Sequence, residues 1–308
     1  MLNRRNFLKF GVASPLVALA GCNTLNSSSL KMSLSQKRFF FTSQGKTAMM
    51  NGDGSGSCYL EFDAPGQATW QPGAFFPDGR VLILSMEPRR DGPGKPFDEY
   101  YHTTPTHIWI HDLDTGSLDE IATKERLAPF ITPQLLLADG RMMIQVVRDK
   151  VPQSFSINLD GSDPRPFTQP GEGMPYGLNM SPDGKRVAYH LAASSGYEIR
   201  VSDVDGSNKT LITKRRGHVF FGPRWSPDGE WIIFQDNHHW EDPGHDWADL
   251  VMSRPDGPVL QHLTEGQTLW FGSSYGSPGN HGRGSNVPVW SKDGSILMSR
   301  RLPDSKVA

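Results

Sequence analysis

The chain has 308 residues with 31 basic and 33 acidic side chains, which gives a net charge of −2. This length is sufficient for a large buried core, and the slight acidity argues against a general nucleic-acid-binding protein. With 32 glycines and 24 prolines, the composition fits a fold with many tight turns.

The N-terminal segment has the features of an export signal and is set aside from the fold. Residues 3–9, Asn-Arg-Arg-Asn-Phe-Leu-Lys, resemble a twin-arginine signal, and residues 10–19 form an apolar stretch too short to span a bilayer. Residues 19–22, Leu-Ala-Gly-Cys, resemble a lipobox, in which the cysteine is lipidated and becomes the first mature residue. The alternative is an ordinary cleaved signal peptide with an incidental Cys22.

We therefore expect a signal peptide at residues 1–21, and a lipidated Cys22 followed by a flexible Ser- and Asn-rich tether to residue 36. Loss of residues 1–21 would leave 28 basic against 33 acidic residues, a net charge of −5. A lipidated Cys22 would leave Cys58 with no partner, so no intramolecular disulfide is expected. The expected location is the cell envelope, at the outer membrane or cell surface, with the periplasmic side as an alternative, and the expected state is a monomer.

A two-turn unit repeats along the rest of the chain. The first turn contains Asp-Gly at residues 78–79, 139–140, 183–184, 228–229 and 293–294, and the central copies are 44 and 45 residues apart. A second turn follows most copies, at residues 113–116, 159–161, 204–206 and 255–257. Paired hairpin turns with a period in the forties are typical of β-propeller blades.

This pattern predicts an all-β fold, a β-propeller of four-stranded blades within residues 37–308. At least four complete blades and a partial fifth are visible in the sequence. Strands within residues 37–62 would close a five-bladed ring. The alternative is a truncated piece of a larger, seven-bladed propeller, which would expose a sheet edge.

Three long insertions fall on one face of this predicted propeller. They span residues 87–106, 236–248 and 266–286, and all of them connect strands at the end opposite the Asp-Gly turns. Because loops on a rigid scaffold often carry binding and catalysis, this face is the expected working face. Seven of the ten histidines map to it: His102, His190, His218, His238, His239, His245 and His281.

The insertion at residues 237–249 is rich in histidine, acids and tryptophan. Imidazole and carboxylate suit a divalent metal, which makes Asp242, His245 and Asp246 candidate ligands. Two alternatives stay open. Trp240 could stack on a sugar, or the tryptophans and proline could only hold the loop in place.

Basic and aromatic residues form two further clusters. Residues 214–218, Lys-Arg-Arg-Gly-His, and Arg224 could bind a carboxylate or sulfate, with a solvated turn as the alternative. In the segment 270–284, Tyr275 could transfer protons and Arg283 could bind an anion, with loop packing as the alternative. No glycine-rich phosphate loop precedes a helix, so nucleotide chemistry is not expected.

The Ser-Pro-Asp-Gly and Asp-Gly turns resemble the TolB-like propeller repeat over residues 60–308. Residues 217–226, Gly-His-Val-Phe-Phe-Gly-Pro-Arg-Trp-Ser, with the histidine-rich insertion, look like the propeller polysaccharide lyases, which include oligogalacturonate and ulvan lyases. In those families a His or Tyr removes the proton beside a uronate carboxylate, and Arg or His, sometimes with a metal, neutralises that carboxylate.

The resemblance implies His218 and His239 as the catalytic pair, with Tyr275 as a second proton carrier. The residues expected to contact an anionic polysaccharide are Arg216, Arg224, Trp240 and Arg283. The leading hypothesis is a lyase that cleaves a uronate-containing polysaccharide, ulvan in particular, by β-elimination. The alternative is a non-catalytic TolB-like lipoprotein that acts as a binding scaffold in the envelope.

Overall fold

The computed structural model describes residues 38–43, 46–51, 55–67, 69–87, 106–123, 135–148, 151–193, 196–237, 247–257, 260–264, 269–270, 289–291 and 293–297. Every regular element in these ranges is a β-strand, which confirms the predicted all-β class. A search of the same ranges for a long apolar helix of membrane-spanning length finds none. The chain divides into two compact units, Met1–Phe62 and Asp63–Ala308.

The first unit contains a three-stranded antiparallel sheet. Its strands are β1 (Arg38–Ser43), β2 (Lys46–Asn51) and β3 (Cys58–Tyr59), in the order β1-β2-β3. Ala48 of β2 lies opposite Phe41 and Tyr59 and is buried. The expected closing strands of residues 37–62 therefore exist as strands, and they pair with each other.

Cys58 on β3 is disulfide-bonded in the structure. The expectation that it has no partner is therefore wrong. Cys22, the chain's other cysteine, lies outside the described residues. A thiol in a disulfide cannot also carry a thioether-linked lipid, so this bond and a lipidated Cys22 exclude each other within one two-cysteine chain.

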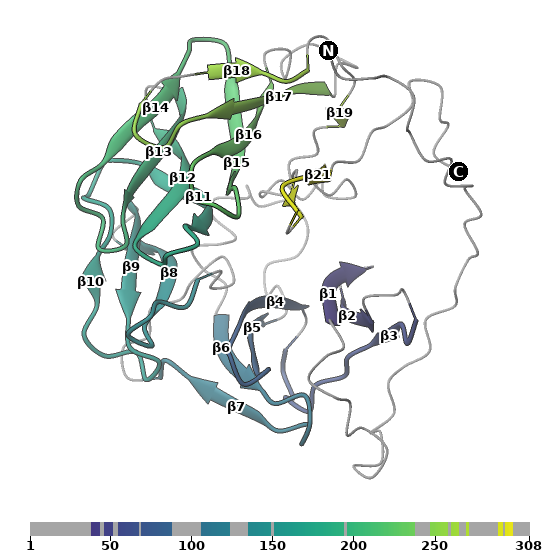
Figure 1. The fold of residues 1–308 in the computed structure, drawn as a ribbon. Coiled ribbons are helices and arrows are strands. Elements are labelled where there is room, and N and C mark those ends of the chain that lie inside the picture. Colours follow the sequence, from purple (N-terminus) through teal and green to yellow (C-terminus); the bar gives the residue numbers. More distant parts are fainter. Residues whose placement is uncertain are drawn as a thin grey trace. The chain divides into compact units, whose positions relative to one another are not determined.

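The second unit is a series of antiparallel sheets (Figure 1). The first contains β4 (Thr69–Phe75), β5 (Val81–Met86), β6 (Thr106–His111) and β7 (Leu118–Ile121). The second contains β8 (Met142–Arg148), β9 (Val151–Ile157) and β10 (Arg165–Pro166). The third contains β11 (Met174–Met180), β12 (Arg186–Ala193), β13 (Gly196–Asp203) and β14 (Thr210–Lys214).

Two further sheets follow. One contains β15 (Val219–Trp225), β16 (Ile232–Asn237), β17 (Trp247–Ser253) and β18 (Leu260–His262), with β19 (Leu269–Trp270) also paired to β17. The other contains β20 (Val289–Trp290) and β21 (Ile296–Leu297). Three of the four predicted complete blades thus have four strands. In the blade of β8–β10, the described residues before the Asp-Gly turn begin at residue 135 and form a bridge between Leu136 and Met142.

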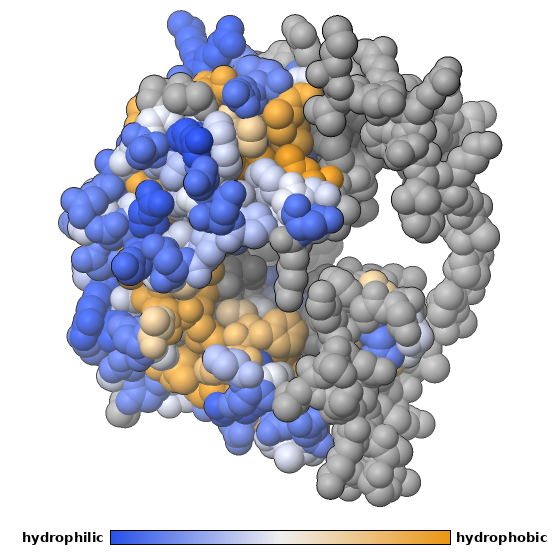
Figure 2. Space-filling model, in the orientation of Figure 1, coloured by the Kyte–Doolittle hydropathy of each residue, from blue (hydrophilic) through white to orange (hydrophobic). Residues whose placement is uncertain are grey.

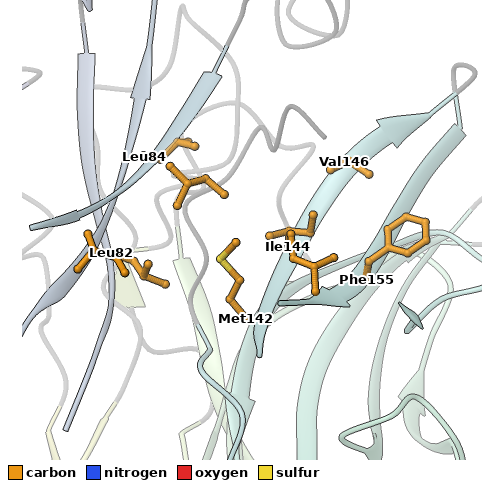
Figure 3. Close-up of a cluster of buried hydrophobic side chains, with 9 residues drawn as sticks. Leu82, Leu84, Met142, Ile144, Val146 and Phe155 are labelled. Atoms are coloured by element: carbon orange, nitrogen blue, oxygen red, sulfur yellow. The ribbon is translucent and has the colours of Figure 1, made fainter. Parts of the chain in front are cut away.

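Consecutive sheets pack face to face through apolar layers. In Figure 3, Leu82 and Leu84 of β5 face Met142, Ile144 and Val146 of β8, and all of these side chains are buried. Equivalent clusters join each later sheet to the next. Figure 2 shows hydrophobic surface where the first two sheets meet, and hydrophilic residues over the outer strands β10 and β14. This stacking of sheets is the blade packing of a β-propeller.

The Asp-Gly turns form as predicted. In the turn between β11 and β12, Asp183 accepts hydrogen bonds from the Ser181 hydroxyl at 2.6 Å and the Lys185 backbone at 3.1 Å. Gly184 has φ +71°, a backbone conformation that glycine adopts without strain. The pKa of Asp183 is lowered, chiefly by the Ser181 hydrogen bond.

Arg141 is a buried structural cation beside the turn between β9 and β10. Its guanidinium donates to the side chains of Asn158 and Asp163, both at 2.9 Å, and to the Ser156 carbonyl at 2.6 Å. Arg165 also binds the Asp163 carboxylate, at 2.7 Å, but from an exposed position. The two arginines thus share one acceptor in different surroundings.

We expect Arg141→Met to lower the free energy of unfolding by about 2–4 kcal/mol, because it leaves buried acceptors without donors. The matched control, Arg165→Met, should cost no more than about 1 kcal/mol, since exposed ion pairs contribute little. Urea unfolding followed by tryptophan fluorescence measures both values. An equal decrease in the free energy of unfolding of the two variants would show that the buried Arg141 interactions stabilise the fold no more than the exposed Arg165 ion pair.

Candidate functional site

One end of the β15–β18 sheet brings together polar residues from three strands. His218 immediately precedes β15, Asp236 lies near the end of β16, and Asp249 lies near the start of β17. The register places Phe220 opposite Asp236, and Asp236 opposite Asp249. These residues therefore gather at the end opposite the Asp-Gly turn, where the insertion of residues 236–248 was predicted.

His218 and Asp236 form a close pair. The distance between His218 Nδ1 and Asp236 Oδ1 is 2.7 Å, and the side chains are only 12% and 5% exposed. The imidazole also stacks on Phe220, with ring centroids 5.8 Å apart and an interplanar angle of 18°. The ring is thus held by one hydrogen bond and one aromatic face.

This hydrogen bond determines the chemistry of the imidazole. A carboxylate only accepts hydrogen bonds, so Nδ1 of His218 carries the hydrogen and donates it to Asp236. In the neutral ring, Nε2 then has the basic lone pair. A carboxylate that orients a histidine in this way is the usual support for a general base.

Asp249 is held by a separate short chain of hydrogen bonds. The Thr264 hydroxyl donates to Asp249 Oδ1 at 3.1 Å and accepts from the Leu250 backbone at 2.9 Å. Thr264 follows β18, so the outer part of the sheet fixes this carboxylate. Asp236 and Asp249, which the sequence analysis did not select, are both buried. Their signal was an acid placed among apolar strand residues, directly beside an insertion.

The predicted basic cluster divides into two parts. Lys214 donates to buried Glu198 at 2.8 Å, so it has a structural role. Burial alone would raise the pKa of Glu198, but hydrogen bonds from Lys214 and Arg200 hold it below its usual value. Arg215 and Arg216 are exposed. A turn closed by the His218 N–H and the Arg215 carbonyl, at 3.2 Å, links these two cations to His218.

His190 and Arg224 lie within strands. His190 on β12 is fully buried, so its side chain is not exposed at the working face to which it was mapped. It stacks on Tyr176 at a centroid distance of 5.5 Å and lies tilted against Phe221 at 4.8 Å. Burial, and then the charge of Arg224, lowers the pKa of His190 to about 3. Arg224 is half-buried and donates to the carbonyls of Gly177 and Pro223, at 3.3 and 2.9 Å.

The other predicted site residues lie outside the described part of the chain. They are Cys22, His102, His238, His239, Trp240, Asp242, His245, Asp246, Tyr275, His281 and Arg283. Of the candidates from the sequence, the structure therefore describes His218, Arg216 and Arg224, as well as His190. Within the described ranges, no group of three or more His, Cys, Asp or Glu side chains could hold a metal ion.

Comparison with known proteins places the fold. A putative TolB from Agrobacterium tumefaciens superposes with a TM-score of 0.55 at 21% identity, covering 85% of this chain and 84% of that one. An oligogalacturonate lyase in complex with manganese gives 0.57 at 17% identity, covering 85% and 70%. The chain has the fold of the TolB-like β-propellers.

Sequence similarity is weaker. An uncharacterized protein from Agrobacterium fabrum is 26% identical over 256 residues, which cover 80% of this chain and 71% of that protein. The Tol-Pal system protein TolB of Shigella flexneri is 40% identical over 52 residues, 16% of this chain and 12% of that protein. No family model matches the sequence. These similarities identify the propeller fold. They do not identify an activity, which is argued below from the geometry of the site.

The buried His190 predicts an acid-sensitive fold. Its pKa is about 3 in the folded chain and near 6.5 when unfolded, so below pH 6.5 the unfolded chain binds a proton that the folded chain does not. The free energy of unfolding should then fall by about 1.4 kcal/mol per pH unit as the pH decreases from about 6 to 5. His190→Phe, which keeps a ring in the stack, should reduce this slope. Equal slopes in urea unfolding would contradict the assignment.

Proposed function

We propose that this protein is a lyase that cleaves an anionic, uronate-containing polysaccharide by β-elimination, with ulvan as the favoured substrate. The observation that carries the proposal is the contact of the half-buried His218 with the buried Asp236, 2.7 Å apart, at the end of a blade beside the exposed Arg215 and Arg216. The superposition with oligogalacturonate lyase supports a propeller scaffold for such a site.

His218 is the proposed base. With Nδ1–H donated to Asp236, Nε2 takes the proton from the sugar carbon next to the carboxylate. The electrons of that C–H bond form a C=C double bond in the ring, and the bond to the glycosidic oxygen at the adjacent carbon breaks. The departing oxygen takes up a proton, for which Tyr275, outside the described residues, remains the proposed donor.

The proton next to a carboxylate is weakly acidic unless the negative charge is neutralised. Arg216 is the proposed partner of the uronate, because its exposed guanidinium lies two residues from His218 and matches a carboxylate or sulfate. Arg224 is a secondary candidate, since its Nη1 already donates to two carbonyls. His239 remains the proposed second member of the catalytic pair, and Trp240 and Arg283 remain proposed substrate contacts; all three lie outside the described residues.

The proposed mechanism does not require a divalent metal, although a metal could take part. The lyase that this chain superposes on is a manganese complex. The described residues do not supply a ligand set, and the candidates Asp242, His245 and Asp246 lie outside them. We therefore derive no step through a metal, and the roles of His218 and Asp236 are independent of one.

A second candidate function rests on the match to TolB. The 40% identity over 52 residues to the Tol-Pal system protein favours a non-catalytic module that binds partners in the cell envelope. We propose a monomer at the envelope in either case, held at the outer membrane or cell surface if Cys22 is lipidated. A scaffold has no need of an oriented histidine base, which is why the lyase is preferred.

Incubation of the protein with ulvan, polygalacturonate or alginate should raise the absorbance near 235 nm, because elimination creates an unsaturated uronate. His218→Ala should abolish the rise, and Asp236→Asn should lower the rate by about 10²-fold or more, since the ring loses its orienting carboxylate. Arg216→Ala should lower kcat as well as raise KM, because the uronate would lose the cation that makes its adjacent proton acidic. Parallel assays with EDTA report whether a metal contributes.

The control is Arg165→Ala, which removes an exposed cation on β10, in another sheet. Folding of each variant is checked by its melting temperature. Full activity in His218→Ala, or no absorbance change with any of the three polymers from folded wild-type protein, would reject the lyase and favour the binding module.

Mass spectrometry of the mature protein from the membrane fraction distinguishes the two fates of the cysteines. Lipidation predicts an N-terminal Cys22 with diacylglycerol mass, release from membranes only by detergent, and a free Cys58 thiol. A disulfide at Cys58, as in the structure, predicts no thiol that reacts with iodoacetamide before reduction. Cys22→Ser should change membrane partitioning only in the first case.

A further inference from the structure

The connection between β14 and β15 presents two adjacent arginines beside His218. It links the outer strand of one sheet to the first strand of the next (Figure 1). Its residues Arg215, Arg216 and Gly217 are all exposed. Because β14 ends and β15 begins here, the connection lies at the same end of the sheets as the proposed catalytic base.

A tight turn fixes the backbone of this connection. The His218 backbone N–H donates to the Arg215 carbonyl at 3.2 Å, which closes a four-residue turn. Gly217 has φ +77°, and Arg216 is not among the residues with positive φ. These signs fit a type II turn, whose third residue has φ near +80° and is preferably glycine. The two arginines therefore hold the first two positions of a defined turn, with Cα atoms about 3.8 Å apart.

Both ends of the turn are anchored to buried carboxylates. At its start, Lys214 Nζ lies 2.8 Å from Glu198 Oε1, and at its end His218 Nδ1 lies 2.7 Å from Asp236 Oδ1. The side chains of Glu198 and Asp236 are only 3% and 5% exposed, so both anchors belong to the body of their sheets. The turn is thus held in place before any ligand binds, which lowers the entropic cost of binding.

The two arginines keep their charges available. Neither Arg215 nor Arg216 forms an ion pair with a residue that the structure describes. By contrast, Arg80, Arg165 and Arg254 each pair with a carboxylate. Adjacent like charges repel each other, and bound oxyanions would relieve this repulsion. The guanidinium fork matches a carboxylate and a sulfate equally well.

We propose that this turn is a two-anion subsite. Arg216 binds the carboxylate of the uronate at which elimination occurs, and Arg215 binds a second oxyanion, a sulfate ester or a carboxylate, on a neighbouring sugar of the same chain. This inference rests on the proposed function and adds its specificity, which is for polymers with two anionic groups close together. Since the second oxyanion does not react, Arg215 determines specificity and has no catalytic role.

The test measures polymer binding by isothermal titration calorimetry in the full protein carrying His218→Asn. The asparagine amide can still donate to Asp236 but has no basic nitrogen, so the turn stays anchored and no substrate is consumed. The ligands are ulvan, the same ulvan after chemical desulfation, and polygalacturonate. Arg215→Gln should weaken binding of the preferred polymer about fivefold. Arg215→Lys should recover part of the affinity, because the charge remains without the fork.

The three ligands identify the second oxyanion. If it is a sulfate ester, desulfation should weaken binding to the parent protein and remove the effect of Arg215→Gln. If it is a carboxylate, Arg215→Gln should weaken binding of polygalacturonate and of both forms of ulvan by the same factor. Either result supports the two-anion subsite.

Arg165→Gln is the matched control, because it removes the same charge from an exposed arginine on β10, in another sheet. It should leave binding unchanged, and the melting temperatures should show that each variant is folded. Unchanged affinity in Arg215→Gln, an equal loss in Arg165→Gln, or no binding of any of the three polymers by the parent protein would overturn the subsite.

Kinetics separate this inference from the lyase itself. In proteins that keep His218, Arg215→Gln should raise KM with little change in kcat, unlike Arg216→Ala. Product formation with an unchanged KM in Arg215→Gln would reject the second anion contact and keep the lyase. Arg215-dependent binding without any rise at 235 nm would keep the anion-binding turn and reject the lyase.

Discussion

Burial of the sheet faces is the constraint on which the second unit depends. A single sheet with large aliphatic residues on its faces is stable only when another sheet covers them. Here the cover for each sheet is its neighbour, through layers such as that of Leu82, Leu84 and Met142. Polar contacts add specificity to the layers. Asn179 accepts the Trp225 backbone N–H at 2.9 Å and its indole N–H at 3.0 Å across two sheets.

This packing restricts where chemistry can occur. Because the middle of each strand is buried, polar groups inside a layer are enclosed by neighbouring side chains, and His190 accepts the Gly222 backbone N–H at its Nδ1, at 3.4 Å, while its ring packs on Tyr176. Groups at the strand ends have more freedom. The His218–Asp236 pair lies at such an end, protected enough for a fixed ring orientation but close to solvent. The same reasoning explains why Arg224, inside β15, is tied to backbone carbonyls.

Local signals predicted most of the fold. The Asp-Gly turns could be read because the Asp183 carboxylate, the Ser181 hydroxyl and the Gly184 backbone act within four residues. Non-local features could not be read in this way. The pairing of Asp236 with His218 depends on a register between two strands, which no local turn motif encodes.

The division of the outer strand into β18 and β19 has a consequence for the evolution of this protein. β17 is paired with β16 on one side and with β18 and β19 on the other before the chain enters residues 271–288, and Asp249 accepts a hydrogen bond from Thr264. The length and composition of that segment can therefore change without a shift in sheet register, because loop length has only a small entropic cost. Descendants of this scaffold could acquire new ligands by exchanging that segment alone, while the His218–Asp236 pair and its supporting sheet stay intact.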